Sequence, residues 1–216
     1  MHGQVCLYAG GHRPYPRPLP RSMTMSSARP SARDRILSTA TGLFNAHGIR
    51  GVGVDRIIAE SGVAKATLYA HFRCKDDLVL AYLRATDTHW RGALTEAAEA
   101  AGPDPRDQLT GVFDALGAAT LRDGFRGCAF TRTAGETEPG TEAHEATAEH
   151  KRAVRAWLTE LARAAGAADP AQLALRISLL VDGAMAAAAL EPRPEFAEAA
   201  REAARALIAE ACPARV

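Results

Sequence analysis

The run Val54-Asp-Arg-Ile-Ile-Ala-Glu-Ser-Gly-Val-Ala-Lys-Ala-Thr-Leu-Tyr-Ala-His-Phe72 predicts two short helices joined by a tight turn. In its first half, apolar residues recur three and four positions apart, which indicates one buried helical face. Gly62 ends that helix, because glycine readily takes the left-handed conformation that closes a helix. In the second half, Leu68 and Phe72 point inward, so Lys65 and its neighbours stay on the outer face. The run therefore reads as a helix-turn-helix whose second helix can offer cationic and hydrogen-bonding side chains to a DNA groove.

A longer pattern around this run resembles the DNA-binding domain of the TetR family of bacterial transcriptional regulators. The resemblance covers roughly residues 31–83 and is carried by Gly48, Ile57, Gly62, Val63, Lys65, Thr67, Leu68, Tyr69, His71, Phe72, Lys75 and Leu78. It implies an all-α protein of about nine helices. A three-helix DNA-binding domain at 31–83, with the helix-turn-helix at about 53–72, would precede a larger helical ligand-binding and dimerisation domain at 84–213.

The resemblance also assigns DNA contacts to particular residues. Lys65 and Ala66 would lie nearest the base edges, where lysine can donate to guanine and the small alanine allows close approach or meets a thymine methyl group. Contacts with phosphates, which set register rather than sequence, are assigned to Thr67, Tyr69, His71 and Lys75, with Arg56 as an additional candidate. For Tyr69 the alternative is packing against the domain's own surface.

The sequence departs from the family pattern at two helix starts. Val52 and Gly53 stand where many members have threonine or serine, so only backbone N–H groups remain to meet a phosphate there. Ala64 replaces a common serine cap before the second helix, a loss that typically costs about 1 kcal/mol.

The charge distribution agrees with a DNA-binding N-terminal part. The net charge is only +1, but residues 1–84 carry twelve Lys or Arg against five Asp or Glu, whereas residues 85–216 carry fourteen against twenty. A basic part that meets a polyanion, followed by an acidic sensing body, would show this division. Four of the arginines precede the predicted fold (Arg13, Arg17, Arg21 and Arg29), and without them residues 31–84 still carry +3.

Residues 1–30 are rich in Pro, Gly, Arg and Ser and lack a periodic apolar face, so we expect a disordered tail. Two interpretations stay open. Either translation begins at Met23 or Met25, or the arginines form an arm that strengthens DNA binding without sequence specificity.

No cofactor or metal site is expected. The four cysteines (Cys6, Cys74, Cys128 and Cys212) form no CxxC pair, which favours reduced thiols in the cytoplasm. His144-Glu145 and Glu149-His150 look like a zinc-protease motif, but the histidines are six apart instead of four, so we read a polar helix start. We expect no apolar run to approach the roughly 18 residues of a membrane span, and we expect no signal peptide.

The C-terminal part predicts further helices and a dimer. Asp104-Pro105 and Asp169-Pro170 combine a capping side chain with proline at the first helical position. The helix after Pro170 is apolar on more than one side, so one face can pack internally while the other, with the last helix, forms a two-fold interface. A pocket for an unidentified apolar ligand would be lined by Trp90, Phe113, Cys128, Phe130, Trp157 and Met185, each of which could equally be plain core.

Three classes of function can be compared with these features. The first is a ligand-responsive repressor that binds a palindromic operator (an inverted repeat) as a homodimer in the bacterial cytoplasm, at the nucleoid when DNA-bound. The second, an enzyme of helical fold, lacks convergent nucleophile, base or metal ligands at workable spacing. The third is a DNA-binding protein that needs no ligand, whether architectural, activating or with its ligand response lost.

Overall fold

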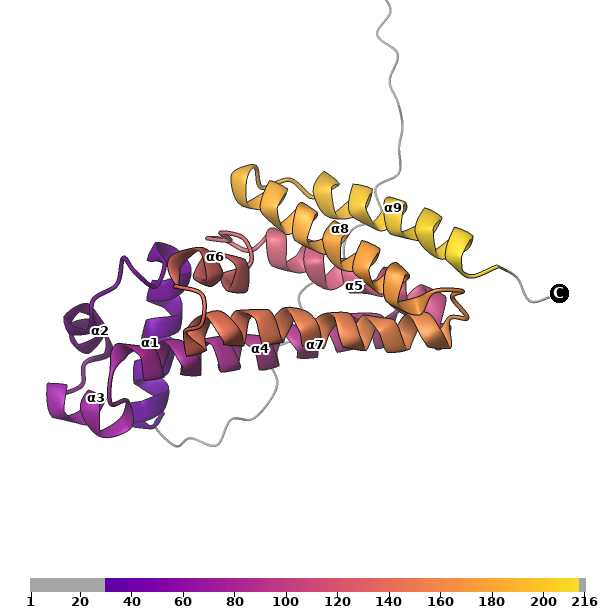
Figure 1. Ribbon diagram of the computed structural model, residues 1–216. Coiled ribbons are helices and arrows are strands. Elements are labelled where there is room, and N and C mark those ends of the chain that lie inside the picture. Colours follow the sequence, from indigo (N-terminus) through magenta and orange to yellow (C-terminus); the bar gives the residue numbers. More distant parts are fainter. Residues whose placement is uncertain (1–29, 214–216) are drawn as a thin grey trace, which may run out of the picture. The chain divides into compact units, whose positions relative to one another are not determined.

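Helices make up most of the chain in the computed structural model, which describes residues 30–213 (Figure 1). Within that range no strand occurs, which confirms the all-α fold. The predicted tail over 1–30, with its arginines and the alternative starts Met23 and Met25, lies outside the described residues apart from Pro30. The described helices are α1 (Ala32–His47), α2 (Val54–Ser61), α3 (Lys65–His71), α4 (Lys75–Ala100), α5 (Pro105–Thr120), α6 (Ala129–Glu136), α7 (Glu142–Ala164), α8 (Pro170–Leu190) and α9 (Glu195–Ala211).

Three of the helix starts follow local capping rules, and two of them, at Asp104 and Asp169, were predicted from the sequence. The Ser31 hydroxyl accepts the backbone N–H of Asp34 at 3.1 Å and donates to the Asp34 carboxylate at 2.7 Å. Asp104 and Asp169 cap α5 and α8, each followed by proline in the first turn. These side chains satisfy backbone donors that have no partner within the helix.

The first hydrophobic cluster joins α1, α2 and α3 to the first turns of α4, and we call residues 31–83 the head. Ile36, Val52, Ile57 and Leu78 are fully buried in it. Gly62 has φ 63° at the end of α2, which is the left-handed conformation expected there. The head is therefore a small three-helix core built on the N-terminal end of α4.

The second cluster lies between the remaining part of α4 and helices α5, α7, α8 and α9, and we call residues 84–213 the body. Leu94, Leu116, Leu158 and Ile177 are central to it. Helix α4 contributes to both clusters without interruption, so it connects the head to the body. In Figure 1, α4 and α7 run side by side away from the head helices, and α5 packs along them.

Helix α6 belongs to the body by sequence but packs on the head. Its Phe130 is buried in the head cluster, and the ring stacks on the imidazole of His150 in α7, with centroids 3.5 Å apart. Figure 1 shows α6 beside α1. This short helix is thus a second connection between head and body, in addition to α4.

Helix α8 corrects the expectation that no segment is apolar enough to cross a membrane. Among the described helices it alone has the length and composition for this, because only Arg176 and Asp182 are charged between Pro170 and Leu190. Core helices of other proteins meet the same criterion, so the finding is weak evidence for a membrane. A third of its most apolar stretch is buried within the subunit, which leaves much apolar surface uncovered.

Candidate nucleic-acid interface and ligand cavity

Helix α3 presents its N-terminal residues to solvent. Lys65 and Ala66 are exposed, whereas Leu68 and Phe72 are buried in the head cluster and hold the helix in place. Ala64 takes the N-cap position without a side-chain hydrogen bond, so the first backbone N–H groups of α3 stay free of a side-chain cap. A short, anchored helix with an open positive end can approach the major groove of DNA.

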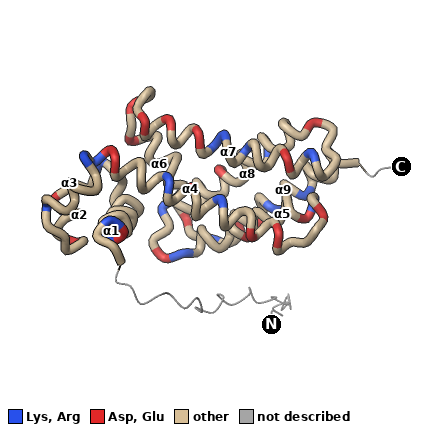
Figure 2. Tube along the Cα trace, turned by 90° about the horizontal axis from the view of Figure 1, so that it is seen from below, with Lys and Arg blue, Asp and Glu red and all other residues tan. Residues whose placement is uncertain are grey.

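The remaining predicted contact residues lie on or next to the same helix. Thr67 is half-buried, His71 is exposed, and Tyr69 leaves 43% of its surface exposed. Lys75 is half-buried at the first position of α4. The fold therefore groups these residues around α3, where Figure 2 also shows Lys and Arg positions on α1 and beside α3.

Two predicted cations have partners within the head. The Arg56 guanidinium donates to Glu60 at 2.7 Å and lies 3.1 Å from the His47 ring nitrogen. The ammonium of Lys65 lies 4.0 Å from the Asp55 carboxylate, with both side chains largely exposed. An exposed pair at that distance is weak, so Lys65 can exchange Asp55 for DNA more readily than Arg56 can leave its two partners.

Arg73, between α3 and α4, is a cation to which the sequence pattern assigned no role. It donates to Asp77 from its backbone at 3.1 Å and from two guanidinium nitrogens at 3.0 and 3.2 Å. The hydrogen bond from Arg73 lowers the pKa of Asp77. The spacing of an arginine four residues before an acid in a first helical turn was the available signal.

At the start of α2, the two residues that depart from the family pattern provide no hydroxyl. Val52 is fully buried in the head cluster, and Gly53 caps α2 with extended backbone but no side-chain hydrogen bond. Position 52 thus contributes core packing, and only backbone N–H groups remain at this helix start.

A cavity of about 280 Å³ lies between α4, α6, α8 and the segment after α5, and we call it the arginine cavity. Its apolar lining includes Trp90, Phe125, Phe130 and Met185. Its polar lining contains three arginines, a histidine and one carboxylate, namely Arg122, Arg126, Arg132, His89 and Asp123, together with Asn45 and Thr86. A smaller cavity of about 30 Å³, where Lys151 and Asp182 form an ion pair, shares Trp90, Cys128 and Met185 with it.

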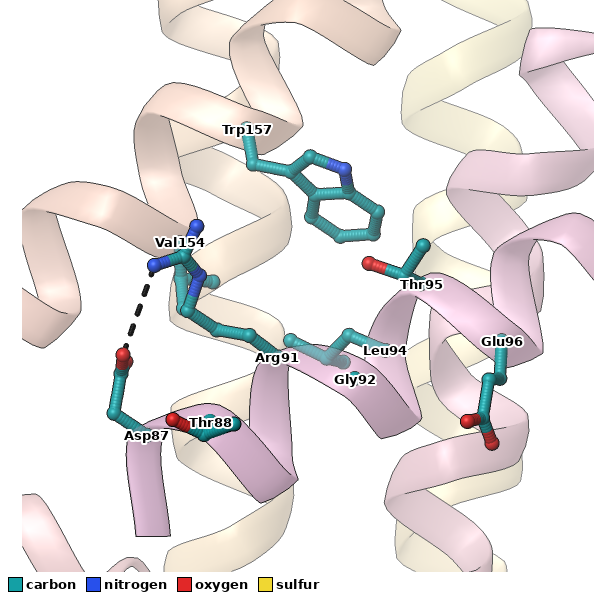
Figure 3. Close-up of a pocket in the computed structure, with 9 residues that line it drawn as sticks. All are labelled: Asp87, Thr88, Arg91, Gly92, Leu94, Thr95, Glu96, Val154 and Trp157. Atoms are coloured by element: carbon teal, nitrogen blue, oxygen red, sulfur yellow. Dashed lines mark ion pairs between the residues drawn. The ribbon is translucent and has the colours of Figure 1, made fainter. Parts of the chain in front are cut away.

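Two grooves follow the α4–α7 surface. One of about 450 Å³ lies below the ring of Trp157, where Arg91 pairs with Asp87 at 3.6 Å (Figure 3). The other, of about 570 Å³, is lined by acids from the first half of α7, where Figure 2 shows acidic positions. Within the described residues, no group of three or more His, Cys, Asp or Glu side chains could hold a metal ion.

The six predicted ligand-pocket residues do not share one cavity. Trp90, Cys128 and Met185 line both the arginine cavity and its small neighbour, and Phe130 lines the former. Trp157 lines the groove of about 450 Å³ between α4 and α7, and Phe113 is buried in the body core and lines none of these four cavities.

His150 departs from the expected polar helix start, because it is only 4% exposed. Its Nδ1 lies 2.6 Å from the Asp87 carboxylate in α4, and its ring stacks on Phe130. Burial lowers the pKa of His150, opposed by the hydrogen bond to Asp87. A neutral imidazole that donates from Nδ1 fits this geometry, so His150 connects α4, α6 and α7 as a buried hydrogen-bonding group.

Helix α6 is joined to the end of α1 and to the turn after it by three hydrogen bonds between residues more than 80 positions apart. Arg132 donates to the backbone carbonyl of Asn45 at 2.8 Å. The Glu136 carboxylate accepts the backbone N–H of Arg50 at 2.7 Å, and the Glu136 carbonyl accepts Nε of Arg50 at 2.7 Å. No sequence pattern pointed to these pairs, because neither partner belongs to a local motif.

The family model described as bacterial regulatory proteins, tetR family, matches residues 36–82. The chain is 35% identical over 79 residues to the HTH-type transcriptional regulator LmrA of Bacillus subtilis (strain 168), a match that spans 42% of that protein's length.

Solved structures match over nearly their whole length. SCO4454, a TetR-family transcriptional regulator from Streptomyces coelicolor, is 37% identical, with a TM-score of 0.79 over 84% of this chain and 96% of that one. E. coli NemR shares the fold at 22% identity, with a TM-score of 0.71 over 82% of this chain and 97% of that one. The chain therefore belongs to the TetR family of bacterial transcriptional regulators, which are DNA-binding proteins.

Proposed function

We propose that the protein is a homodimeric repressor that binds an inverted-repeat operator and is released from it by a small ligand with an apolar part. The observation that carries the proposal is the exposed start of α3, where Lys65 and Ala66 face solvent while Leu68 and Phe72 anchor the helix in the head. The domain division at 31–83 and 84–213 is supported by the two separate hydrophobic clusters. A cytoplasmic, nucleoid-associated location goes with this role.

The individual DNA contacts are proposed as follows. Lys65 donates to base edges, and Ala66 lets the helix approach them. Phosphate contacts are proposed for Thr67, Tyr69, His71 and Lys75. Arg56 is a weaker choice because Glu60 and His47 already engage it.

The dimer is proposed to form through α8 and α9. Leu175 and Leu179 are exposed and four residues apart on α8, so they share one face. Exposed apolar surface of this kind is typical of an interface. A two-fold dimer would also place two copies of α3 in successive major grooves about 34 Å apart.

Release is proposed to depend on the cavities of the body. The arginine cavity is lined by Trp90, Cys128, Phe130 and Met185. Its α4 wall belongs to the same helix whose first turns support the head. A ligand that fits only one of two positions of α4 shifts the population of protein molecules toward that position. If that position binds DNA poorly, the affinity for DNA falls, at most by the factor by which the ligand prefers this position over the other.

The first test is a selection of bound fragments. The purified protein is incubated with sheared genomic DNA of its source, and the recovered fragments are sequenced at two salt concentrations. An enriched inverted repeat supports the proposal, whereas weak binding without a motif and with a steep salt dependence contradicts it.

The recovered repeat then serves as the probe for Lys65→Ala. We expect a loss of about 1–3 kcal/mol of operator affinity in a fluorescence-anisotropy titration, because a base-edge contact is removed. Arg84→Ala is the matched control, since Arg84 is an exposed cation beyond the head. Equal affinities for wild type and Lys65→Ala would disprove the assignment of Lys65.

A further inference from the structure

The arginine cavity is lined by more positive than negative side chains. Arg122, Arg126 and Arg132 line it, and Asp123 is the one lining carboxylate. Within the part of the chain that the structure describes, none of the three guanidinium groups forms a salt bridge. Arg122 contacts the His89 ring nitrogen at 3.3 Å, and Arg132 donates to a backbone carbonyl.

The N-terminus of α6 adds to this charge. Cys128 is the N-cap and makes no side-chain hydrogen bond to the helix. In the first hydrogen bond within α6, the N–H of Arg132 donates to the Cys128 carbonyl. The N–H groups of Ala129, Phe130 and Thr131 come before this bond and have no carbonyl partner within the helix. Cys128, Ala129 and Phe130 all line the cavity, which therefore faces the positive end of the helix dipole.

Part of the cavity lining is apolar. Trp90 and Met185 line it from α4 and α8, and Phe125 lines it from the segment after α5. A pocket that is apolar with a few convergent polar groups orients a ligand through those groups. Here the convergent groups are donors and cations, and planar guanidinium forks match carboxylate geometry.

We propose that the arginine cavity binds a small organic carboxylate whose apolar body lies against Trp90, Phe125 and Met185 and whose carboxylate meets Arg122, Arg126 and Arg132. The inference rests on the proposed function and narrows its ligand from an apolar compound to an apolar anion. The volume of about 280 Å³ suits a compound with one or two rings or a medium-length acyl chain.

Arg132 gives such a ligand a direct route to the head. Its guanidinium both lines the cavity and donates to the Asn45 carbonyl in the last turn of α1 at 2.8 Å. The Asn45 side chain in turn accepts from the Tyr82 hydroxyl of α4 at 2.7 Å. A carboxylate that engages Arg132 competes with the Asn45 carbonyl for the same donors, so ligand binding loosens the contact between α6 and α1.

The direct test is calorimetric titration of the full-length protein, without DNA, at fixed ionic strength. The probes are benzoate, 2-naphthoate and octanoate, each paired with its neutral amide. We expect at least one acid to bind about tenfold or more tightly than its amide, because charge-assisted hydrogen bonds outweigh neutral ones. If no acid binds more tightly than its amide, the proposal is wrong.

Variants locate the binding. The double variant Arg122→Gln/Arg126→Gln changes two exposed side chains of a connecting segment, so the fold should persist, and circular dichroism checks this. It should lose the preference for the acid over the amide. Arg163→Gln, at the far end of α7, should keep it. If the double variant kept the full preference for the acid over the amide, the anion would bind elsewhere and the proposal would be wrong.

DNA binding separates this inference from the proposed function. With the selected operator, a saturating acid should weaken binding by wild type and have a smaller effect on Arg132→Gln, whose Asn45 contact is already absent. Operator binding that no acid alters in either protein would overturn the anion-driven release while leaving the repressor intact. Acid binding by a protein that selects no operator would uphold the cavity and contradict the repressor.

Discussion

At the scale of single residues, the burial of His150 links the free energy of unfolding to pH. Burial lowers its pKa in the folded protein, as do the nearby charges of Lys151 and Arg91, while Asp87 works in the opposite direction. The unfolded chain therefore binds more protons than the folded one at pH values below about 6.5, the ordinary histidine pKa. The contribution of neutral His150 to the free energy of unfolding is fully present above that value. This contribution is lost as the pH falls from 6.5 towards the pKa of His150 in the folded protein.

The prediction is measured by urea unfolding of wild type and His150→Gln at pH 7.5, 6.5 and 5.5. Wild type should lose more stability than His150→Gln between pH 6.5 and 5.5, although removal of the Asp87 hydrogen bond lowers the stability of His150→Gln at every pH. His71→Gln is the control, because His71 is exposed on α3. If both variants reduced the pH dependence of stability equally, burial of His150 would not be the cause of that pH dependence.

His150 also shows what single-residue reasoning can miss. The sequence places it near His144 in a polar, glutamate-rich segment, which indicates an exposed helix start. The structure buries it because Asp87, 63 positions earlier, supplies an acceptor and Phe130 covers the ring. Local charge predicts exposure only when no distant partner satisfies the polar group, and such a partner has no signature in the nearby sequence.

At the scale of helices, the junction between α1 and α6 depends on Gly48. This residue closes α1 with φ 75° and ψ 166°, a backbone region essentially reserved for glycine. A Cβ built there would lie 2.4 Å from a Glu136 carboxylate oxygen. Gly48→Ala should therefore cost about 1–3 kcal/mol of stability from the backbone alone, as measured by urea unfolding. It should also displace Glu136, which accepts the Arg50 N–H.

Gly42→Ala in the same helix is the matched comparison. Gly42 is exposed, and a Cβ there meets nothing within 4 Å. In a helix interior alanine is favoured over glycine by about 1 kcal/mol, so this variant should be more stable than wild type. Opposite signs for the two substitutions would establish the Gly48 junction, and a stabilised Gly48→Ala would disprove it.

The helices also divide into those that the sequence predicts closely and those that it does not. Asp104 and Asp169 cap their helices as predicted, because a cap and its helix are within three residues of each other. The head follows for the same reason, since its buried positions recur at helical spacing in one short run. The packing of α6 on α1 could not be predicted, because Arg132 and Asn45 are 87 residues apart. The arginine cavity likewise assembles only when three helices and a connecting segment converge.

At the scale of the whole molecule, α8 explains how one helix can resemble a membrane span and still belong to a DNA-binding protein. Much of its most apolar stretch is left uncovered within one subunit, and Leu179 is 61% exposed. A second copy that packs against α8 and α9 would bury this surface. The same two-fold symmetry would set the spacing of the two α3 helices, so assembly and operator recognition should be lost together.

Leu179→Glu tests this coupling. A glutamate at a buried, apolar interface leaves an uncompensated charge, which costs about 3–5 kcal/mol, so the dimer dissociation constant should rise at least about 100-fold in sedimentation-velocity measurements. Leu121→Glu is the matched control, since Leu121 is 48% exposed at the end of α5, outside α8 and α9. Operator affinity should fall for Leu179→Glu and stay unchanged for Leu121→Glu, because a monomer engages only one half-site. A Leu179→Glu protein that remains dimeric and binds its operator normally would show that this face of α8 is not where the subunits meet.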